Sequence, residues 1–187
     1  LKPIFKELVE KKIPDGTLKD RLTGELDWFV SIVIKDAHKN LRTFQYFLEK
    51  ISIIFDAIGN QYPTLHQVII RYTFRSSIRY MKGEPMPIWD GDYGRQEFGT
   101  EKIFNADQEL GFRFVDDLIV ENIIHVPYIH TVLSRFARIA EKKGQLSNDP
   151  YQFISGWWTS EDEQVKEWLE AIELNIKSGK YSTELYT

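Results

Sequence analysis

The feature that most constrains the fold is a run of apolar residues at helical spacing between Asn40 and Gly59. These residues recur at steps of three and four, the pattern of one buried helix face: Leu41, Phe44, Phe47, Leu48, Ile51, Ile54, Phe55 and Ile58. Asn40 can cap the first turn with its side-chain oxygen, and Gly59 can take the left-handed conformation that ends a helix. The sequence therefore predicts an amphipathic helix over 41–58 that needs a large apolar partner surface.

Arg42 falls in the first turn of this predicted helix, where the helix dipole makes a cation mildly unfavourable. Two interpretations are open. The side chain is solvated or paired with a nearby acid, or it faces an anion that the free N–H groups of the helix N-terminus also attract. On composition alone the first interpretation is the more common one.

Apolar residues at helical spacing predict further helices along the chain, over 1–12, 18–38, 64–82, 127–144 and 160–179, with shorter ones after Phe112 and Pro150. Capping boxes are expected at Thr17, at Thr64 and at Ser160. The β-branched run inside 18–38 is also compatible with a buried strand, but the length of the segment favours a helix. The 64–82 helix would bury Leu65, Ile69, Tyr72 and Ile78.

The periodicity fails between Gly83 and Gly111, a segment with prolines, glycines and scattered aromatic residues. A segment this long without clear periodicity is uncommon in a compact domain and is often functional. We expect an all-α fold, an irregular bundle of about eight helices with one long irregular segment. The expected division is a helical subdomain over 1–82, the irregular segment over 83–111, and a C-terminal helical subdomain over 112–187 packed on the first.

Composition limits the class of protein. Among 187 residues, 42% are hydrophobic and 14% aromatic, which is enough for a packed core. The net charge of −4 counts against a general nucleic-acid binder, and the absence of cysteine excludes disulfides and thiolate metal sites. No apolar run reaches the length of a membrane span and no signal peptide is visible, so we expect a cytoplasmic protein without a membrane partner. Because the chain begins at Leu1, we expect a piece of a longer protein.

Motifs that would carry catalysis or hold a metal are missing. The sequence has no phosphate loop with Gly-Lys-Ser or Gly-Lys-Thr, and His125 and His130 are five positions apart, a poor spacing for a shared metal. Asp90-Gly91-Asp92 is expected to be a solvated turn. Asp116 and Asp117 could form an acid/base pair, but consecutive helix positions point about 100° apart, which favours a local salt bridge for one of them. We predict no catalytic residue and no metal site in this chain.

Basic residues at helical spacing form two stripes, each on one side of a predicted helix. The first stripe is Arg71, Arg75 and Arg79, and the second is Arg135, Arg138 and Lys142. Each stripe could contact phosphates or an acidic partner, whereas a solvated helix face is the more common outcome for such patterns.

Aromatic residues supply a second set of candidate contacts. Trp89 and Tyr93 lie in the irregular segment, where they are candidates for partner binding. Trp157 and Trp158 are consecutive, so both cannot face fully inward and one is expected at a domain edge.

The segment from His38 to Phe44 resembles the Asn-Leu-Arg-Thr helix in the C-terminal lid region of bacterial AAA-type and KAP-like P-loop NTPases, a group that includes proteins linked to phage defence. Phe112-Arg113-Phe114-Val115-Asp116-Asp117 is similar to a segment of the helical region after that lid, and so is Trp157-Trp158 before an acidic helix start. Together these short motifs span Asn40 to Ile172. Both Walker motifs of the family are missing here.

The resemblance implies a lid-like subdomain over 1–82 and a non-catalytic helical region of a larger ATPase. Such a region would couple nucleotide state to partner binding or assembly. Arg42, with Asn40 beside it, would be similar to a sensor-2 arginine that reaches toward the γ-phosphate in an upstream nucleotide-binding domain. ATP and Mg would be cofactors of the complete protein, not of this chain, and a homo-oligomer is compatible with the family. The alternatives are a stand-alone helical protein-interaction module and a nucleic-acid sensor that uses the basic stripes, which net acidity disfavours.

Overall fold

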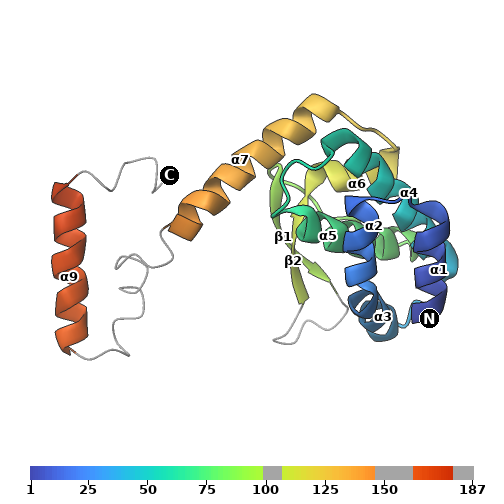
Figure 1. The fold of residues 1–187 in the computed structure, drawn as a ribbon, viewed down its shortest axis with the longest axis horizontal. Helices are drawn as coiled ribbons and strands as arrows, with labels where there is room; N and C mark the ends of the chain where they lie inside the picture. The colour runs from blue at the N-terminus through green and yellow to red at the C-terminus, as the bar shows by residue number, and fades with distance from the viewer. Residues whose placement is uncertain (99–106, 146–161, 179–187) are drawn as a thin grey trace. The chain divides into compact units, whose positions relative to one another are not determined.

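A computed structural model describes residues 1–98, 107–145 and 162–178. In these ranges the chain forms eight helices and one two-stranded sheet, so the predicted all-α class is confirmed (Figure 1). The chain divides into two compact units, residues 1–134 and residues 135–187. This grouping differs from the expected division, because 113–134 joins the same unit as 1–82. None of the helices in the described ranges combines the length and hydropathy that a transmembrane span requires.

Five phenylalanine rings form the centre of the first unit. They come from α1 (Lys2–Lys12), α3 (Leu26–Lys35), α4 (Leu41–Ile58) and α5 (His66–Met81), and are Phe5, Phe29, Phe44, Phe47 and Phe74. The Phe5 and Phe44 rings stack with centroids 4.0 Å apart, and Phe29 meets Phe74 edge to face at 4.8 Å. Aromatic pairs in these geometries add to the stabilisation that burial alone provides. The apolar stripe predicted for 41–58 therefore finds its partner surface in three other helices.

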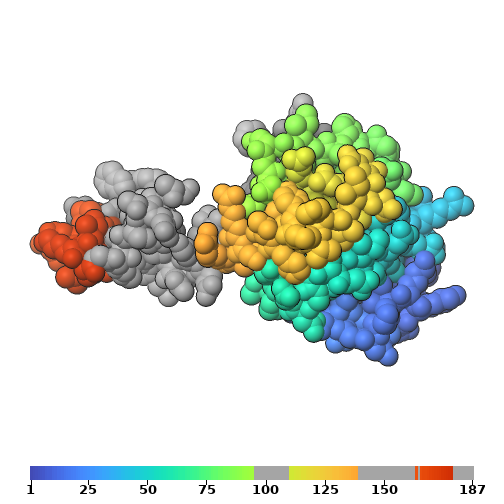
Figure 2. All heavy atoms as spheres, turned by 90° about the horizontal axis from the view of Figure 1, so that it is seen from above, coloured from blue at the N-terminus to red at the C-terminus, as the bar shows by residue number. Residues whose placement is uncertain are grey.

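Helix α4 begins and ends as the sequence predicts. Asn40 Oδ1 accepts a hydrogen bond from the backbone N–H of Arg42 at 3.0 Å, and Gly59 closes the helix with φ of 57°. Every residue of the predicted stripe is buried except Leu41, which lies in the first turn and is exposed. In Figure 2 the surface of α4 lies between that of the N-terminal helices and that of residues 113–134.

The prediction of one helix over 18–38 is wrong in one respect. The helix is broken at Gly24 and Glu25. The chain forms α2 (Thr17–Gly24) and then α3, with Glu25 outside helical geometry at ψ of 2°. Glycine is a poor helix former, and Glu25 accepts hydrogen bonds from Gln67 and Arg71 on α5. This long-range pairing holds the break in place.

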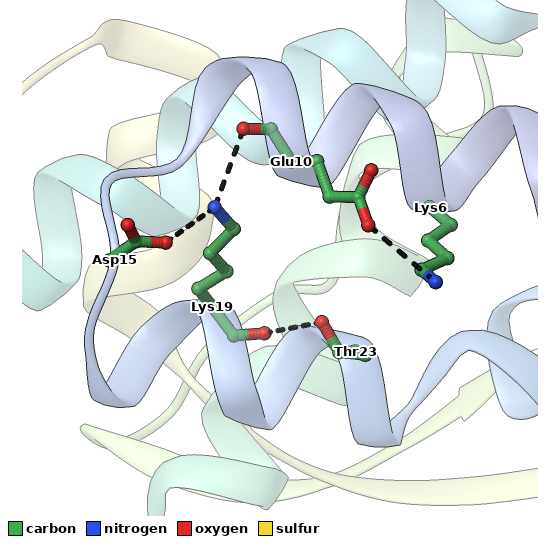
Figure 3. A network of polar contacts seen from close by, with 5 residues as sticks. All are labelled: Lys6, Glu10, Asp15, Lys19 and Thr23. Carbon is green, nitrogen blue, oxygen red and sulfur yellow. Dashed lines mark hydrogen bonds and ion pairs between the residues drawn. The ribbon is translucent and has the colours of Figure 1, made fainter.

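Two of the three predicted capping boxes are also wrong, and the third, at Ser160, lies outside the described residues. The residue before α2 is Gly16, and the residue before α5 is Leu65, and neither makes a side-chain cap hydrogen bond. Between α1 and α2 the turn is held instead by the Lys19 ammonium, which donates to Asp15 Oδ1 at 2.7 Å and to the carbonyl of Glu10 at 3.5 Å (Figure 3). The Lys19 side chain, which connects the end of α1 to the turn, takes the place of a side-chain cap on α2.

The segment expected to be irregular contains a β-hairpin. Strands β1 (Tyr93–Phe98) and β2 (Asp107–Phe112) pair antiparallel, with Gly94 opposite Gly111, and β2 packs against α5. The strands escaped prediction because their residues, Tyr-Gly-Arg-Gln-Glu-Phe and Asp-Gln-Glu-Leu-Gly-Phe, do not alternate between apolar and polar types. Packing against a helix supports this short sheet.

Helix α6 (Arg113–Glu121) follows β2 directly and is attached to α4 by two polar contacts. The Tyr46 hydroxyl donates to the carbonyl of Ile119 at 2.6 Å, and the Lys50 ammonium donates to Asn122 Oδ1 at 2.7 Å. Asn122 has φ of 57°, the left-handed conformation common after a helix C-terminus. The two remaining helices are α7 (Val126–Gln145) and α9 (Asp162–Lys177).

Candidate functional site

A buried carboxylate organises the polar side of α5. Asp116 Oδ2, on α6, accepts hydrogen bonds from the Tyr72 hydroxyl at 2.7 Å and from the Trp89 indole N–H at 2.8 Å. Tyr72 and Ser76 lie one turn apart on α5, and both are buried with Asp116. We call Tyr72, Ser76, Trp89 and Asp116 the Asp116 junction. It joins α5, α6 and the segment that leads to the hairpin.

The hairpin meets this junction through a glycine. A Cβ atom built at Gly111 would lie 2.3 Å from the Tyr72 ring, far inside van der Waals contact. Only a residue without a side chain lets β2 approach the tyrosine this closely. The Trp89 ring stands edge-on to Tyr72 with centroids 6.2 Å apart. Tyr72 is therefore enclosed by β2 on one side and by Trp89 on another.

Burial raises the pKa of the Asp116 carboxyl above its ordinary range. The hydrogen bonds from Tyr72 and Trp89, with the charge of Arg79, lower the same pKa and only partly offset the burial. Burial likewise raises the pKa of the Tyr72 hydroxyl, which stays protonated and donates. The junction thus holds a carboxylate as an acceptor between two buried or half-buried donors.

Asp117 has a different environment from its neighbour. Its carboxylate forms an ion pair with Arg113 at 3.7 Å, and burial raises its pKa. The expectation that one of the two aspartates is a local salt-bridge partner is confirmed for Asp117. Asp116 is instead an acceptor whose partners lie 44 and 27 positions away, which no local pattern indicates.

Arg42 is exposed at the start of α4. Its guanidinium makes no hydrogen bond or ion pair with any other residue in the described ranges, while its backbone N–H is held by Asn40. Below it, the buried Thr43 hydroxyl meets His38 Nε2 at 2.7 Å. Burial, and then the charge of Lys82, lowers the pKa of His38. The backbone of this turn is therefore anchored, and the arginine side chain extends into solvent.

The first basic stripe does not form a common surface, contrary to the pattern at residues 71, 75 and 79. Arg75 is only 1% exposed, and Arg79 is half-buried near Asp116. Arg71 pairs with Glu25 at 2.9 Å and lies over the Trp28 ring. The reason is that α5 is covered by α2, α4, α6 and β2, which leaves no continuous solvent face. In the second stripe Arg135 and Arg138 are exposed, and the side chain of Lys142 lies outside the described ones.

The aromatic candidates in the 83–111 segment are engaged within the chain. Trp89 is held by Asp116, and Tyr93 lies beside Phe112 with ring centroids 6.4 Å apart. Ile88, which sequence reasoning did not single out, is 97% exposed. Trp157 and Trp158 lie outside the described residues. Among the described residues, no group of three or more potential metal ligands is present.

No family model, curated protein or solved structure matches this chain. The resemblance to the helical regions of P-loop NTPases therefore stays a prediction.

Proposed function

We propose that the chain is a non-catalytic helical region of a larger P-loop ATPase, in which Arg42 senses a nucleotide phosphate. The observation that carries the proposal is the exposure of Arg42, whose guanidinium has no partner among the described residues. Arginine is permanently charged and presents a planar fork of donors that matches phosphate oxygens. An upstream nucleotide-binding domain would supply the phosphate, with ATP and Mg as its ligands.

The setting of Arg42 supports this role. Its helix is held by Phe44 and Phe47 in the aromatic core, and its first turn by the Asn40 cap. A sensor must stand on a rigid element so that nucleotide binding and helix position change together. The partial positive charge at the N-terminus of α4 adds an attraction for anions.

The test uses the product of the complete reading frame. Arg42→Ala should lower ATP turnover at least tenfold, because arginine contacts to a transferring phosphate are worth orders of magnitude in rate. Arg21→Ala, at an exposed arginine on α2, is the matched control and should leave turnover unchanged. A reading frame without a phosphate loop, or normal turnover in Arg42→Ala, would overturn the proposal.

The second candidate function is a helical protein-interaction module. The almost fully exposed Ile88 favours it, because the adjacent Trp89 anchors the backbone and leaves Ile88 presented to solvent. In the nucleic-acid alternative, the 71–79 stripe is not available for contacts because its arginines are buried or half-buried. Phosphate contacts would therefore depend on Arg135 and Arg138. Unchanged ATP turnover in Arg42→Ala, combined with lost partner binding in Ile88→Ser, would favour the interaction module.

A further inference from the structure

The loop over 59–65, which connects α4 to α5, contains a residue in a strained conformation. Tyr62 has φ of 58°, in the left-handed region that a bulky residue rarely adopts. Pro63 follows it, and the residue before a proline is normally extended. Such a conformation persists only where surrounding contacts hold it, and strained positions of this kind are common at conformational switches.

The Tyr62 side chain attaches this loop to α7. Its hydroxyl oxygen lies 2.8 Å from Ser134 Oγ and 3.2 Å from His130 Nδ1, and its ring centroid lies 5.9 Å from that of His130. His130 and Ser134 are one turn apart on α7, and Ser134 is the last residue of the first compact unit. The loop therefore holds α7 at the point where the chain leaves this unit.

A buried histidine fixes the backbone next to Tyr62. The His66 side chain is fully buried, and its ring lies against the Phe55 ring with centroids 4.8 Å apart. His66 Nε2 lies 2.7 Å from the carbonyl oxygen of Gln61, which can only accept, so Nε2 carries the proton and donates. Gln61 directly precedes Tyr62, and this buried hydrogen bond therefore helps to hold the strained residue.

The surroundings of His66 suit only a neutral ring. Its Nδ1 atom is buried and has no hydrogen-bond partner in the described part of the chain. Protonation would place an N–H without an acceptor, and a positive charge, beside the Phe55 ring. The charged group that acts on the ring from another described element is Arg21 of α2, which disfavours a second cation. Burial lowers the pKa of His66, the Gln61 hydrogen bond partly offsets this, and the charge of Arg21 lowers the pKa further.

We propose that the 59–65 loop is a pH-sensitive latch, in which neutral His66 holds the loop so that Tyr62 attaches α7, and protonation of His66 releases α7. A protonated ring must leave its buried position, so Gln61 loses its hydrogen bond. Tyr62 then relaxes toward an extended backbone, and its hydroxyl leaves Ser134 and His130. The released state binds more protons than the latched state below the ordinary histidine pKa, so the latch weakens as pH falls.

Hydrogen exchange of the complete chain tests the latch at pH 7.5 and pH 5.5, with protection corrected for the pH dependence of intrinsic exchange. In wild type, the protection of the 129–134 amides should fall by up to about tenfold on acidification. This limit is set by a ring that is neutral when latched and has the ordinary pKa of 6.5 when released. A change below about twofold would overturn the proposal.

Two variants connect this response to the two ends of the loop. His66→Gln keeps an N–H donor for Gln61 and removes the titration, so the protection of 129–134 should be the same at both pH values. Tyr62→Phe removes the hydroxyl, so the protection of 129–134 should be low and independent of pH. The first turn of α5 should still respond to pH in Tyr62→Phe, because His66 is intact.

His38→Gln is the matched control, because His38 is another histidine whose pKa is lowered by burial but it lies outside the latch. It should leave the pH response of 129–134 unchanged. A full response in Tyr62→Phe, or a reduced one in His38→Gln, would show that α7 responds only through unfolding of the whole unit, and the proposal would fail. If circular dichroism shows that His66→Gln does not fold, Tyr62→Phe and His38→Gln decide the question.

Discussion

The two sides of α5 differ in what they need from the rest of the chain. On one side Phe74 lies among the rings of Phe29, Phe44 and Phe47, where any apolar surface of suitable shape would serve. On the other side Tyr72 requires one acceptor atom, Asp116 Oδ2, at hydrogen-bond distance. On the first side, a substitution that changes the size of an apolar side chain lowers stability in proportion to the size of the change. On the second side, stability depends on the presence of particular hydrogen-bonding atoms.

The largest effect is expected from removing a ring on the apolar side. Phe29→Ala should lower the free energy of unfolding by about 3–5 kcal/mol, because it leaves a cavity between α3, α4 and α5. Urea denaturation measures this, with Phe29→Leu as a milder control. A loss below about 1 kcal/mol would show that the rings are not the main source of stability.

On the polar side, Asp116→Ala should cost about 2–3 kcal/mol, because it leaves the Tyr72 hydroxyl and the Trp89 indole N–H without an acceptor. Asp116→Asn keeps an acceptor oxygen and removes the buried charge, so it should cost much less near pH 7. Equal losses in both variants would mean that the junction needs the charge and not only the acceptor.

A smaller effect is expected where the hairpin meets Tyr72. Gly111→Ala places a methyl carbon 2.3 Å from the Tyr72 ring and should cost about 1–2 kcal/mol as the strand and ring move apart. Combining it with Tyr72→Ala should remove most of the added cost, since the obstructing ring is gone. A double variant that loses the full sum of both single effects would contradict this close approach.

The part of the fold that could be predicted is the part with local signals. The 41–58 helix, its Asn40 cap and its buried stripe follow from periodicity and from the residue types at its ends. The break at Gly24 could not be predicted, because Glu25 finds its partners on α5, more than 40 positions away. The sequence predicts that Tyr72 is buried, but it does not identify Asp116 as the acceptor of its hydrogen bond.

The candidate sites follow the same rule. The exposure of Arg42 agrees with the mismatch between a cation and the first turn of a helix. Helical spacing does not predict the burial of Arg75, because the spacing within α5 carries no information on which other elements cover that helix. The hairpin was missed because its strands do not alternate and are stabilised by packing on α5.

The pH dependence of stability in wild type and Asp116→Asn tests the central contrast most directly. Burial raises the pKa of Asp116, so the folded chain holds this proton more tightly than the unfolded chain. The stability of wild type relative to Asp116→Asn should therefore fall as pH rises from about 4, the ordinary pKa of a carboxyl group, through the raised pKa of the folded chain. Urea denaturation of both proteins across this range measures the difference and cancels the other titrating groups. A difference that rises with pH would show that the hydrogen bonds from Tyr72 and Trp89 outweigh burial, and the account of the polar side would be wrong.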